Sequence, residues 1–156
     1  IIKENKMNIR ELNKFEDRPL NLLLSADPSQ TSINDYVDRG ICFVAEEQQK
    51  IIGIFVLLPT RPKTIELVNI AVTEERQGEG IGKQLVLAAI KKAKFDGYKT
   101  IEVGTGNSSI GQLSLYQKCH FRIIGVDINF FTKHYTKEIF ENGIQCIDMI
   151  RLSQEL

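Results

Sequence analysis

The stretch Glu66-Leu-Val-Asn-Ile-Ala-Val72-Thr-Glu-Glu-Arg-Gln77-Gly78-Glu-Gly80-Ile-Gly82-Lys-Gln-Leu85 decides the fold of this 156-residue chain. Its apolar, β-branched run over 67–72 predicts a strand that is buried on both faces. From Ile81 to Ala93 apolar residues recur at helical spacing, and Gly97 predicts the helix end. The three glycines between strand and helix let the backbone approach a ligand, and a helix start offers unpaired N–H groups to an anion. The stretch therefore predicts a phosphate cradle.

Spacing separates three kinds of phosphate-binding loop. A dinucleotide fingerprint fails because Lys83 stands where its third glycine belongs, and a P-loop fails because Gln84 follows Gly82-Lys83. The pattern Gln/Arg-x-x-Gly-x-Gly/Ala does match, with Gln77, Gly80 and Gly82. In its strand–turn–helix setting it resembles the acetyl-CoA-binding motif of the Gcn5-related N-acetyltransferase (GNAT) superfamily. An ordinary glycine-rich turn between strand and helix is the structural alternative.

Composition narrows the functional classes. Twenty basic and twenty acidic residues give zero net charge, so no general basic field is present for nucleic acid. No apolar run is long enough to cross a bilayer, and we expect no membrane partner. The three cysteines are widely spaced and show no metal-ligand grouping. Cys42 and Cys146 lie in apolar, strand-like segments, so we expect them to be reduced core residues. We also expect no metal and a cytoplasmic location.

Patterning along the chain predicts the element order β-α-α-β-β-β-α-β-α-β-β. The predicted strands cover 7–12, 41–46, 51–58, 66–72, 99–104, 121–127 and 144–152. The predicted helices cover 13–25, a short stretch from Ser32 or Asn34 to Gly40, 81–96, and a stretch from residue 110, and 59–63 is expected to be a connecting loop. The superfamily shows the same order. The resemblance implies an α/β fold with a mixed sheet of about seven strands, splayed central strands and about four helices. The length suits a single domain over 1–156. Because the first methionine is Met7, either Met7 is the natural start or 1–6 are a disordered or expression-derived start.

The resemblance implies how acetyl-CoA, the co-substrate, would be held. The main chain of the helix-opening turn would bind the pyrophosphate, over Gln77, Gly78, Glu79, Gly80, Ile81, Gly82 and Lys83. The backbone of the preceding strand would contact the pantetheine at Ile70, Ala71 and Val72. The family's usual asparagine stands seven residues before its tyrosine, where this chain has Ser109, whereas Asn107 stands nine before. Both are candidate cofactor contacts, and Asn107 serves equally well as a helix cap.

Two side chains are candidates for the chemistry. Tyr116 lies in Leu-Tyr-Gln-Lys-Cys-His120-Phe, which is similar to the family's Leu-Tyr-x-x-x-Gly-Phe segment, so it would contact the cofactor and protonate the leaving thiolate. Glu66, fourteen residues before Gly80, occupies the position of the general base in the family's histone-acetylating members. A packed core tyrosine and a solvent-facing glutamate are the structural alternatives. His120 replaces the expected glycine, so the turn there must tolerate a side chain.

The resulting prediction is an acetyl-CoA-dependent N-acetyltransferase that acts on a primary amine of a small molecule or peptide. The amine would attack directly in a ternary complex. A non-catalytic module that senses acetyl-CoA or CoA is the alternative, and the failed loop spacings disfavour a nucleotide-binding domain. The aromatic and charged segment 129–143 borders the acceptor pocket in the resembling family. A homodimer is one arrangement that the sequence leaves open.

Overall fold

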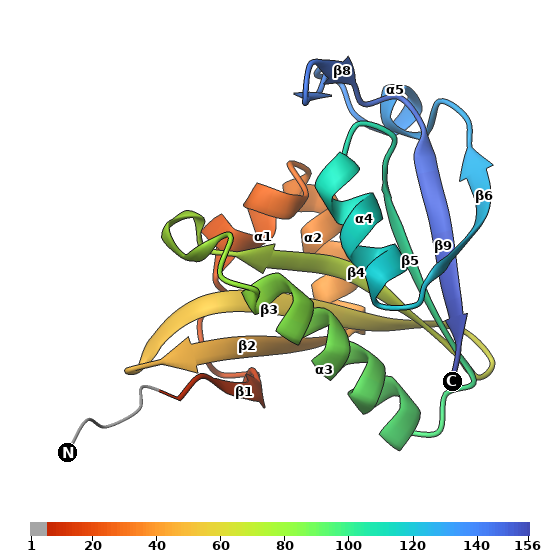
Figure 1. Cartoon of the computed structure of the whole chain (residues 1–156). Coiled ribbons are helices and arrows are strands. Elements are labelled where there is room, and N and C mark those ends of the chain that lie inside the picture. Colours follow the sequence, from red (N-terminus) through yellow and green to blue (C-terminus); the bar gives the residue numbers. More distant parts are fainter. Residues whose placement is uncertain (1–5) are drawn as a thin grey trace.

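A seven-stranded mixed sheet forms the centre of the protein in this computed structural model, which describes residues 6–156 (Figure 1). The predicted non-domain start falls mostly on 1–5, outside the described residues. The strands are β1 (Asn8–Glu11), β2 (Ile41–Glu47), β3 (Lys50–Arg61), β4 (Thr64–Val72), β5 (Thr100–Gly106), β6 (Arg122–Asp127), β7 (Phe140–Glu141), β8 (Ile144–Gln145) and β9 (Met149–Glu155). The helices are α1 (Leu20–Ala26), α2 (Gln30–Arg39), the single-turn η1 (Glu74–Arg76), α3 (Ile81–Phe95), α4 (Ile110–Lys118) and α5 (Phe130–His134).

The two central strands of the sheet splay apart. The sheet order is β1-β2-β3-β4-β5-β9-β6, and only β4 and β5 run parallel. Their pairing covers four residues on each strand and stops at Leu67 and Val103, although both strands continue. Figure 1 shows them diverging beyond that point. The predicted splay is therefore confirmed, and the edge of β4 that faces β5 has no strand partner from Val68 onward.

A bulge in β4 accompanies the start of the splay. Leu67 pairs with Leu57 and Asn69 with Val56 of β3, which leaves Val68 as the extra residue. Because of this insertion, Leu67 and Ile70 lie three residues apart yet share one core. The bulge thus turns the side chains of the following residues relative to a regular strand.

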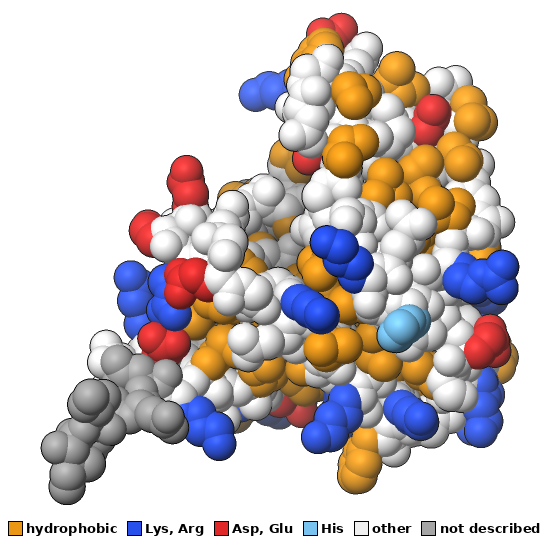
Figure 2. Space-filling model, viewed as in Figure 1, with side chains coloured by type: hydrophobic (Ala, Val, Ile, Leu, Met, Phe, Trp, Pro, Cys, Tyr) orange, Lys and Arg blue, Asp and Glu red, His pale blue; other side chains and the backbone are white. Residues whose placement is uncertain are grey.

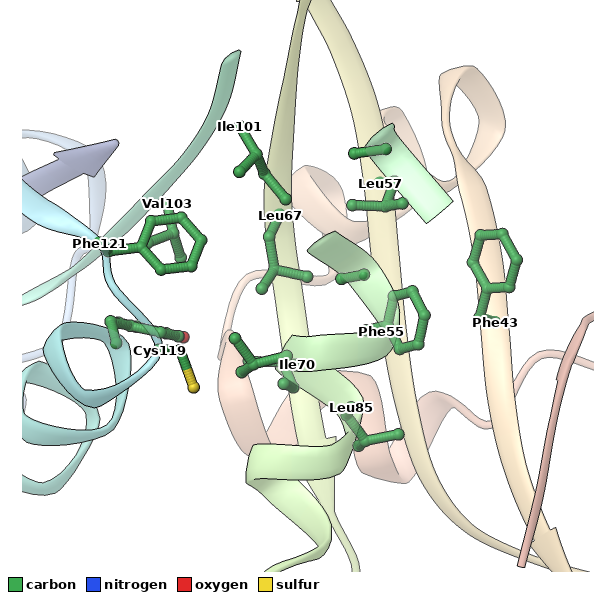
Figure 3. Close-up of a cluster of buried hydrophobic side chains, with 14 of the residues drawn as sticks. Phe43, Phe55, Leu57, Leu67, Ile70, Leu85, Ile101, Val103, Cys119 and Phe121 are labelled. Atoms are coloured by element: carbon green, nitrogen blue, oxygen red, sulfur yellow. The ribbon is translucent and has the colours of Figure 1, made fainter. Parts of the chain in front are cut away.

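Two apolar cores cover the two faces of the sheet. One joins the sheet to α3 and to the end of α4, and Figure 3 shows Leu85 of α3 and Phe121 after α4 in this cluster. Phe43 and Phe55, paired across β2 and β3, stack in the same core with ring centroids 4.8 Å apart. The other core joins the opposite face to α1 and α2, through buried residues such as Leu23. Burial on both faces explains why β3 and β4 read as apolar runs.

The first helix is shorter than the sequence predicts. The predicted range was 13–25, whereas α1 begins only after Pro19. Residues 13–16 form a turn instead, in which Asn13 Oδ1 accepts a hydrogen bond from Phe15 N (3.1 Å). Glu16 Oε1 accepts a second one from Asn13 N (3.0 Å). These local bonds offer the backbone an alternative to the helix.

Two further boundaries differ from the prediction. Helix α2 begins earlier, because Ser29 at its N-cap accepts a hydrogen bond from Ser32 N on Oγ (3.2 Å). The predicted loop 59–63 is largely strand: β3 continues to Arg61 and β4 begins at Thr64. Only two residues therefore form that turn, and Lys63 adopts the left-handed conformation in it (φ 60°).

The C-terminal region holds elements that the sequence did not predict. The predicted strand 144–152 is interrupted between β8 and β9, because Asn107 Oδ1 accepts hydrogen bonds from Ile147 N (2.8 Å) and Asp148 N (3.0 Å). Helix α5 and strand β7 lie in the segment 129–143, and β7 forms a hairpin with β8 directly after it. The described residues therefore form five α-helices rather than about four. His120 adopts φ 73°, so the turn after α4 does accommodate a side chain where glycine was expected.

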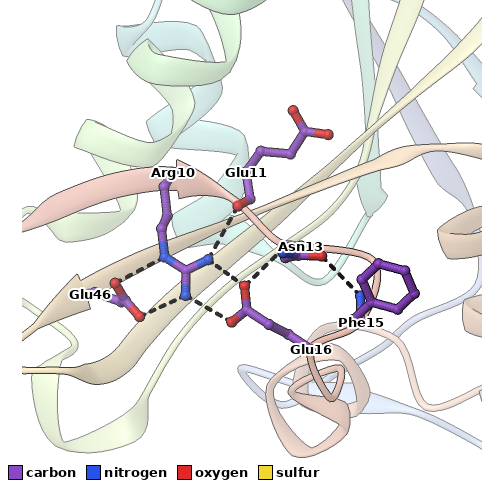
Figure 4. Close-up of polar contacts among 6 residues, drawn as sticks. All are labelled: Arg10, Glu11, Asn13, Phe15, Glu16 and Glu46. Carbon is purple, nitrogen blue, oxygen red and sulfur yellow. Dashed lines mark hydrogen bonds and ion pairs between the residues drawn. The ribbon is translucent and has the colours of Figure 1, made fainter.

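An arginine bridge fastens the first strand. Arg10 of β1 donates hydrogen bonds to both carboxylate oxygens of Glu16 (2.6 and 2.8 Å) and of Glu46 (2.8 and 3.0 Å), as Figure 4 shows. Arg10 therefore joins β1, β2 and the turn before α1. Its hydrogen bonds lower the pKa of Glu16 to about 2, and the pKa of Glu46 is lowered for the same reason.

This bridge predicts part of the acid sensitivity of the fold. A carboxyl whose pKa is lowered by folding stabilises the native state above its unfolded pKa, and that contribution disappears as the pH falls through the folded value. We expect the urea midpoint of the wild type to fall between about pH 5 and about pH 2, and Glu16→Gln to fall less over the same range. Glu11→Gln is the control, because no cation among the described residues pairs with Glu11. Equal pH dependence of wild type and Glu16→Gln would contradict the prediction.

Candidate active site

The turn before α3 presents a row of backbone donors. Gly78 and Gly80 adopt left-handed conformations (φ 81° and 82°), which glycine reaches without a side-chain penalty. After Gln77, the next amide that donates to another backbone group is Gln84 N, which bonds Gly80 O (3.2 Å). The N–H groups from 78 to 83 are therefore available to an anion at the positive end of the α3 dipole. This is the predicted cradle.

A cavity of about 1150 Å³ begins at this cradle and runs along the splay of β4 and β5. It is lined by residues 67–72 of β4, by 104–106 of β5 and by the start and end of α4. The connection between α1 and α2 and the segment 134–141 line the rest. Figure 2 shows the surface recessed between the side that carries η1 and the side that carries β7 and β8. The fold thus places the cradle, the splay and the C-terminal segment around one space.

Most of the predicted cofactor contacts lie on this cavity. Those that line it are Ile70, Ala71, Val72, Gln77, Gly78, Ile81, Gly82, Ser109 and Tyr116. Those that do not line it are Glu79, Gly80, Lys83 and Asn107, and the candidate base Glu66 does not line it either. Glu79 instead pairs with Arg76 (2.9 Å). Gln77 donates from Nε2 to Val72 O (3.1 Å), which ties the cradle to the end of β4.

Tyr116 combines burial with an unused hydroxyl. Its side chain is 3% exposed and packs edge-on against Phe121, with ring centroids 5.9 Å apart. No side-chain hydrogen bond among the described residues involves its hydroxyl, although the residue lines the cavity. Burial raises the pKa of the Tyr116 phenol above its ordinary value. The phenol therefore keeps its proton at neutral pH and has it free to donate.

Glu66 lies apart from Tyr116. It stands on β4 before the splay, where Arg151 Nη1 of β9 donates to its Oε1 (3.3 Å). Burial raises the pKa of Glu66, and the nearby positive charge of Arg151 opposes this shift. The structure therefore brings Tyr116, but not Glu66, onto the wall of the cavity. Any proton that Glu66 takes from an amine in the cavity would have to travel through water.

The two candidates before α4 have different surroundings. Asn107 is engaged with the β8–β9 connection, since it also donates from Nδ2 to Gln145 O (3.1 Å). Ser109 lines the cavity and donates from Oγ to Glu141 of the β7–β8 hairpin (3.0 and 3.1 Å). Neither side chain caps α4. Of the two side chains, only Ser109 lines the cavity.

The sequence did not predict the hydrogen-bonded polar cluster around Asp27, which also lines the cavity. Asp27, after α1, accepts hydrogen bonds from Tyr36 Oη on Oδ2 (3.1 Å) and from Tyr135 Oη on Oδ1 (2.8 Å). Asn69 of β4 donates from Nδ2 to Tyr36 Oη (2.8 Å). Tyr135 lies 108 positions from Asp27 in the sequence, so no local pattern could have joined them.

The prediction of reduced, buried cysteines is confirmed for Cys42 and Cys146. Cys42, Cys119 and Cys146 are free thiols and buried. Cys146 lines the cavity, and its burial raises the pKa of the thiol. Within residues 6–156 no group of His, Cys, Asp and Glu is arranged to hold a metal ion, and no helix has the length and apolar character to cross a membrane.

Comparison with known proteins agrees with this geometry. The Acetyltransferase (GNAT) family profile matches residues 9–121. An uncharacterized N-acetyltransferase, YvbK, of Bacillus subtilis (strain 168) is 55% identical over 97% of both chains. A GNAT family acetyltransferase from Elizabethkingia anophelis with acetyl-CoA bound is 47% identical, with a TM-score of 0.95 over 99% of this chain and 100% of its own. An IAA acetyltransferase from Bacillus cereus ATCC 14579 is 54% identical, with a TM-score of 0.93 over 97% and 100%.

The fold and the site together indicate the class of protein, an acyltransferase. In it the N–H groups at the start of α3 form an anion-binding cradle beside the splayed strands β4 and β5. The chain belongs to the Acetyltransferase (GNAT) family and is an N-acetyltransferase.

Proposed function

We propose that the protein transfers the acetyl group of acetyl-CoA to a primary amine of a small molecule or peptide, by direct attack within a ternary complex. The observation that carries the proposal is that the free N–H row and the Tyr116 hydroxyl meet the same cavity at the strand splay. The Elizabethkingia anophelis relative, which holds acetyl-CoA, supports this co-substrate.

The residues present fit acetyl-CoA. The N–H groups from 78 to 83 would hold the pyrophosphate, and the glycines leave room for its approach. The unpaired edge of β4 at Ile70 and Val72 would receive the pantetheine arm. Acetyl-CoA supplies an activated thioester, whose polarised carbonyl a backbone N–H of this edge would stabilise.

The chemistry requires two proton movements. A C–N bond forms between the amine and the acetyl carbon, and the C–S bond breaks with its electron pair going to sulfur. Tyr116 Oη gives its proton to that sulfur, since its hydroxyl has no other partner among the described side chains. The amine gives up a proton to water, and Glu66 is the proposed final base. Direct attack is favoured because the Cys146 thiol, with its raised pKa, is a poor nucleophile.

The test is a measurement of CoA thiol release from acetyl-CoA with a panel of primary amines. Amine-dependent release supports the transferase. Binding of acetyl-CoA without release for any amine would instead favour the sensor module. Initial rates with both substrates varied should give intersecting lines, as a ternary complex requires; parallel lines would indicate a covalent acetyl-enzyme.

The role proposed for Glu66 predicts a pH effect. Only its deprotonated form accepts a proton, so activity should be present above its raised pKa and fall as the pH drops through it. We expect Glu66→Gln to lower kcat/KM and to flatten this acidic limb. Glu102→Gln is the comparison variant: it removes a neighbouring charge on β5 that raises the pKa of Glu66, so the acidic limb should remain and move to lower pH. An unchanged acidic limb in Glu66→Gln would assign the base to another group.

A further inference from the structure

The cavity has an acidic end opposite the cradle. We call it the acceptor end, and it comprises the last turn of α1 with the connection to α2 (24–29) and the segment 134–141. Three carboxylates line it: Asp27, Glu138 and Glu141. No ion pair among the described residues involves any of the three, whereas Arg76, near the cradle, is paired with Glu47 (3.1 Å) as well as with Glu79. Two other groups at this end, Lys137 and His134, carry or can carry positive charge.

Asp27 is the most firmly held of these carboxylates. Besides the two tyrosine hydroxyls, Ser29 N donates to its Oδ1 (3.0 Å). Three donors from α2, the α1–α2 connection and the C-terminal segment therefore fix its position. They satisfy its hydrogen bonds but leave its negative charge without a cation. A carboxylate that lines a cavity in this state is prepared for a positively charged ligand.

The side-chain oxygen of Asn69 provides a second, independent observation, because it has no hydrogen-bond donor. Its side chain is 4% exposed and lines the same cavity. Nδ2 is held by Tyr36 Oη and by Leu23 O (3.1 Å). Oδ1 is the one buried side-chain polar atom of the described residues without a hydrogen-bond partner. A buried acceptor left unpaired is costly, so it points to a ligand N–H.

Asn69 and Asp27 belong to one hydrogen-bonded chain that leads from the splay to the acceptor end. Asn69 immediately precedes Ile70, where the pantetheine arm is proposed to lie. Tyr36 connects its amide to Asp27. An acceptor that follows this chain would have its reacting amine near Asn69 and its remote part near Asp27.

We propose that the acceptor carries a second cationic group besides the reacting amine, that Asp27 binds this cation, and that Asn69 Oδ1 accepts a hydrogen bond from the reacting amine. The proposal rests on the transferase function above. The reacting amine must be uncharged when it attacks the thioester. It therefore cannot neutralise the carboxylate of Asp27 at that step, and a second, cationic group of the acceptor is needed for this. Asp27 thereby sets specificity, and Asn69 positions the nucleophile.

The test compares two acceptors of equal chain length, 1,5-diaminopentane and 1-aminopentane, with the wild type and Asp27→Asn. A charge-assisted hydrogen bond predicts a wild-type preference for the diamine of about 10- to 100-fold in kcat/KM. Asp27→Asn, which keeps the shape of the side chain, should lose most of this preference through a raised KM for the diamine. Its KM for acetyl-CoA should stay within about twofold, because Asp27 is hydrogen-bonded to Ser29, Tyr36 and Tyr135 and to no residue of the turn 77–83.

Two controls separate specificity from structure. Asp96→Asn removes a carboxylate at the far end of α3, where it pairs with Lys92, and should keep the preference. Tyr135→Phe removes one hydrogen bond to Asp27 but leaves the carboxylate charge of Asp27 in place. This variant should therefore keep part of the preference for the diamine. A wild type without a diamine preference, or an Asp27→Asn enzyme that retains it, overturns the inference while leaving the transferase intact. Absence of CoA release with every amine would overturn both.

Discussion

Tyr116→Phe is expected to lower kcat by about 10²- to 10⁴-fold, the range typical of a lost general acid. The substitution removes only the hydroxyl. The ring would keep its packing against Phe121, and the side chain is buried enough that phenylalanine suits the site. Since no described side chain hydrogen-bonds this hydroxyl, its removal leaves no protein group unpaired. The melting temperature and the Kd for acetyl-CoA should therefore change little.

Single-turnover measurement of CoA release isolates the chemical step from product release. Tyr98→Phe is a matched control, because Tyr98 follows the end of α3 and does not line the cavity. A thiol of lower pKa needs less protonation, so an acetyl thioester with a more acidic leaving group should restore part of the lost rate in Tyr116→Phe. A rate close to that of the wild type would show that water, rather than Tyr116, protonates the sulfur.

The cradle could be predicted from sequence because everything that makes it is local. Strand, turn and helix follow one another within 66–85, and the glycines that adopt positive φ are visible as residue types. The position of Tyr116 at the end of α4 follows in the same way from a short segment. Local patterns also predicted the order of the main elements along the chain. The splay of β4 and β5 was predicted by the family resemblance.

The acceptor end could not be predicted, because it depends on registers between distant segments. Asp27 meets Tyr135 because the β5–β9 pairing fixes where the C-terminal segment lies relative to the end of α1. Glu66 shows the same limit. Its spacing from the cradle is fixed by sequence, but its pairing with Arg151 is fixed by the β4–β5 and β5–β9 registers. The bulge at Val68 changes which side of the sheet the following residues face, compared with a regular strand. Valine is common in strands, so its residue type gives no sign of the bulge.

Gly80→Val is expected to raise the Kd for acetyl-CoA by about 10²-fold or more. Gly80 is the N-cap of α3 at φ 82°, a conformation that costs a β-branched residue roughly 1–3 kcal/mol. No atom lies within 4 Å of the added Cβ, so the protein can fold around the side chain. It can escape the strain only by rearranging the turn, and that rearrangement removes donors from the row at 78–83. Each charge-assisted hydrogen bond lost costs about 1.5–3 kcal/mol, or roughly tenfold or more in Kd.

Gly97→Val provides a closely matched control for this prediction. Gly97 has φ 85° and equally open surroundings, but it lies at the other end of α3. Both variants should lose a similar amount of stability in urea, whereas only Gly80→Val should lose acetyl-CoA affinity in calorimetry. Gly82→Ala adds a case without backbone strain, because Gly82 is helical and its Cβ would make only ordinary contact with Leu115 (3.7 Å). Weaker binding there would measure the obstruction of ligand approach alone, and unchanged affinity in both Gly80→Val and Gly82→Ala would place the pyrophosphate away from this turn.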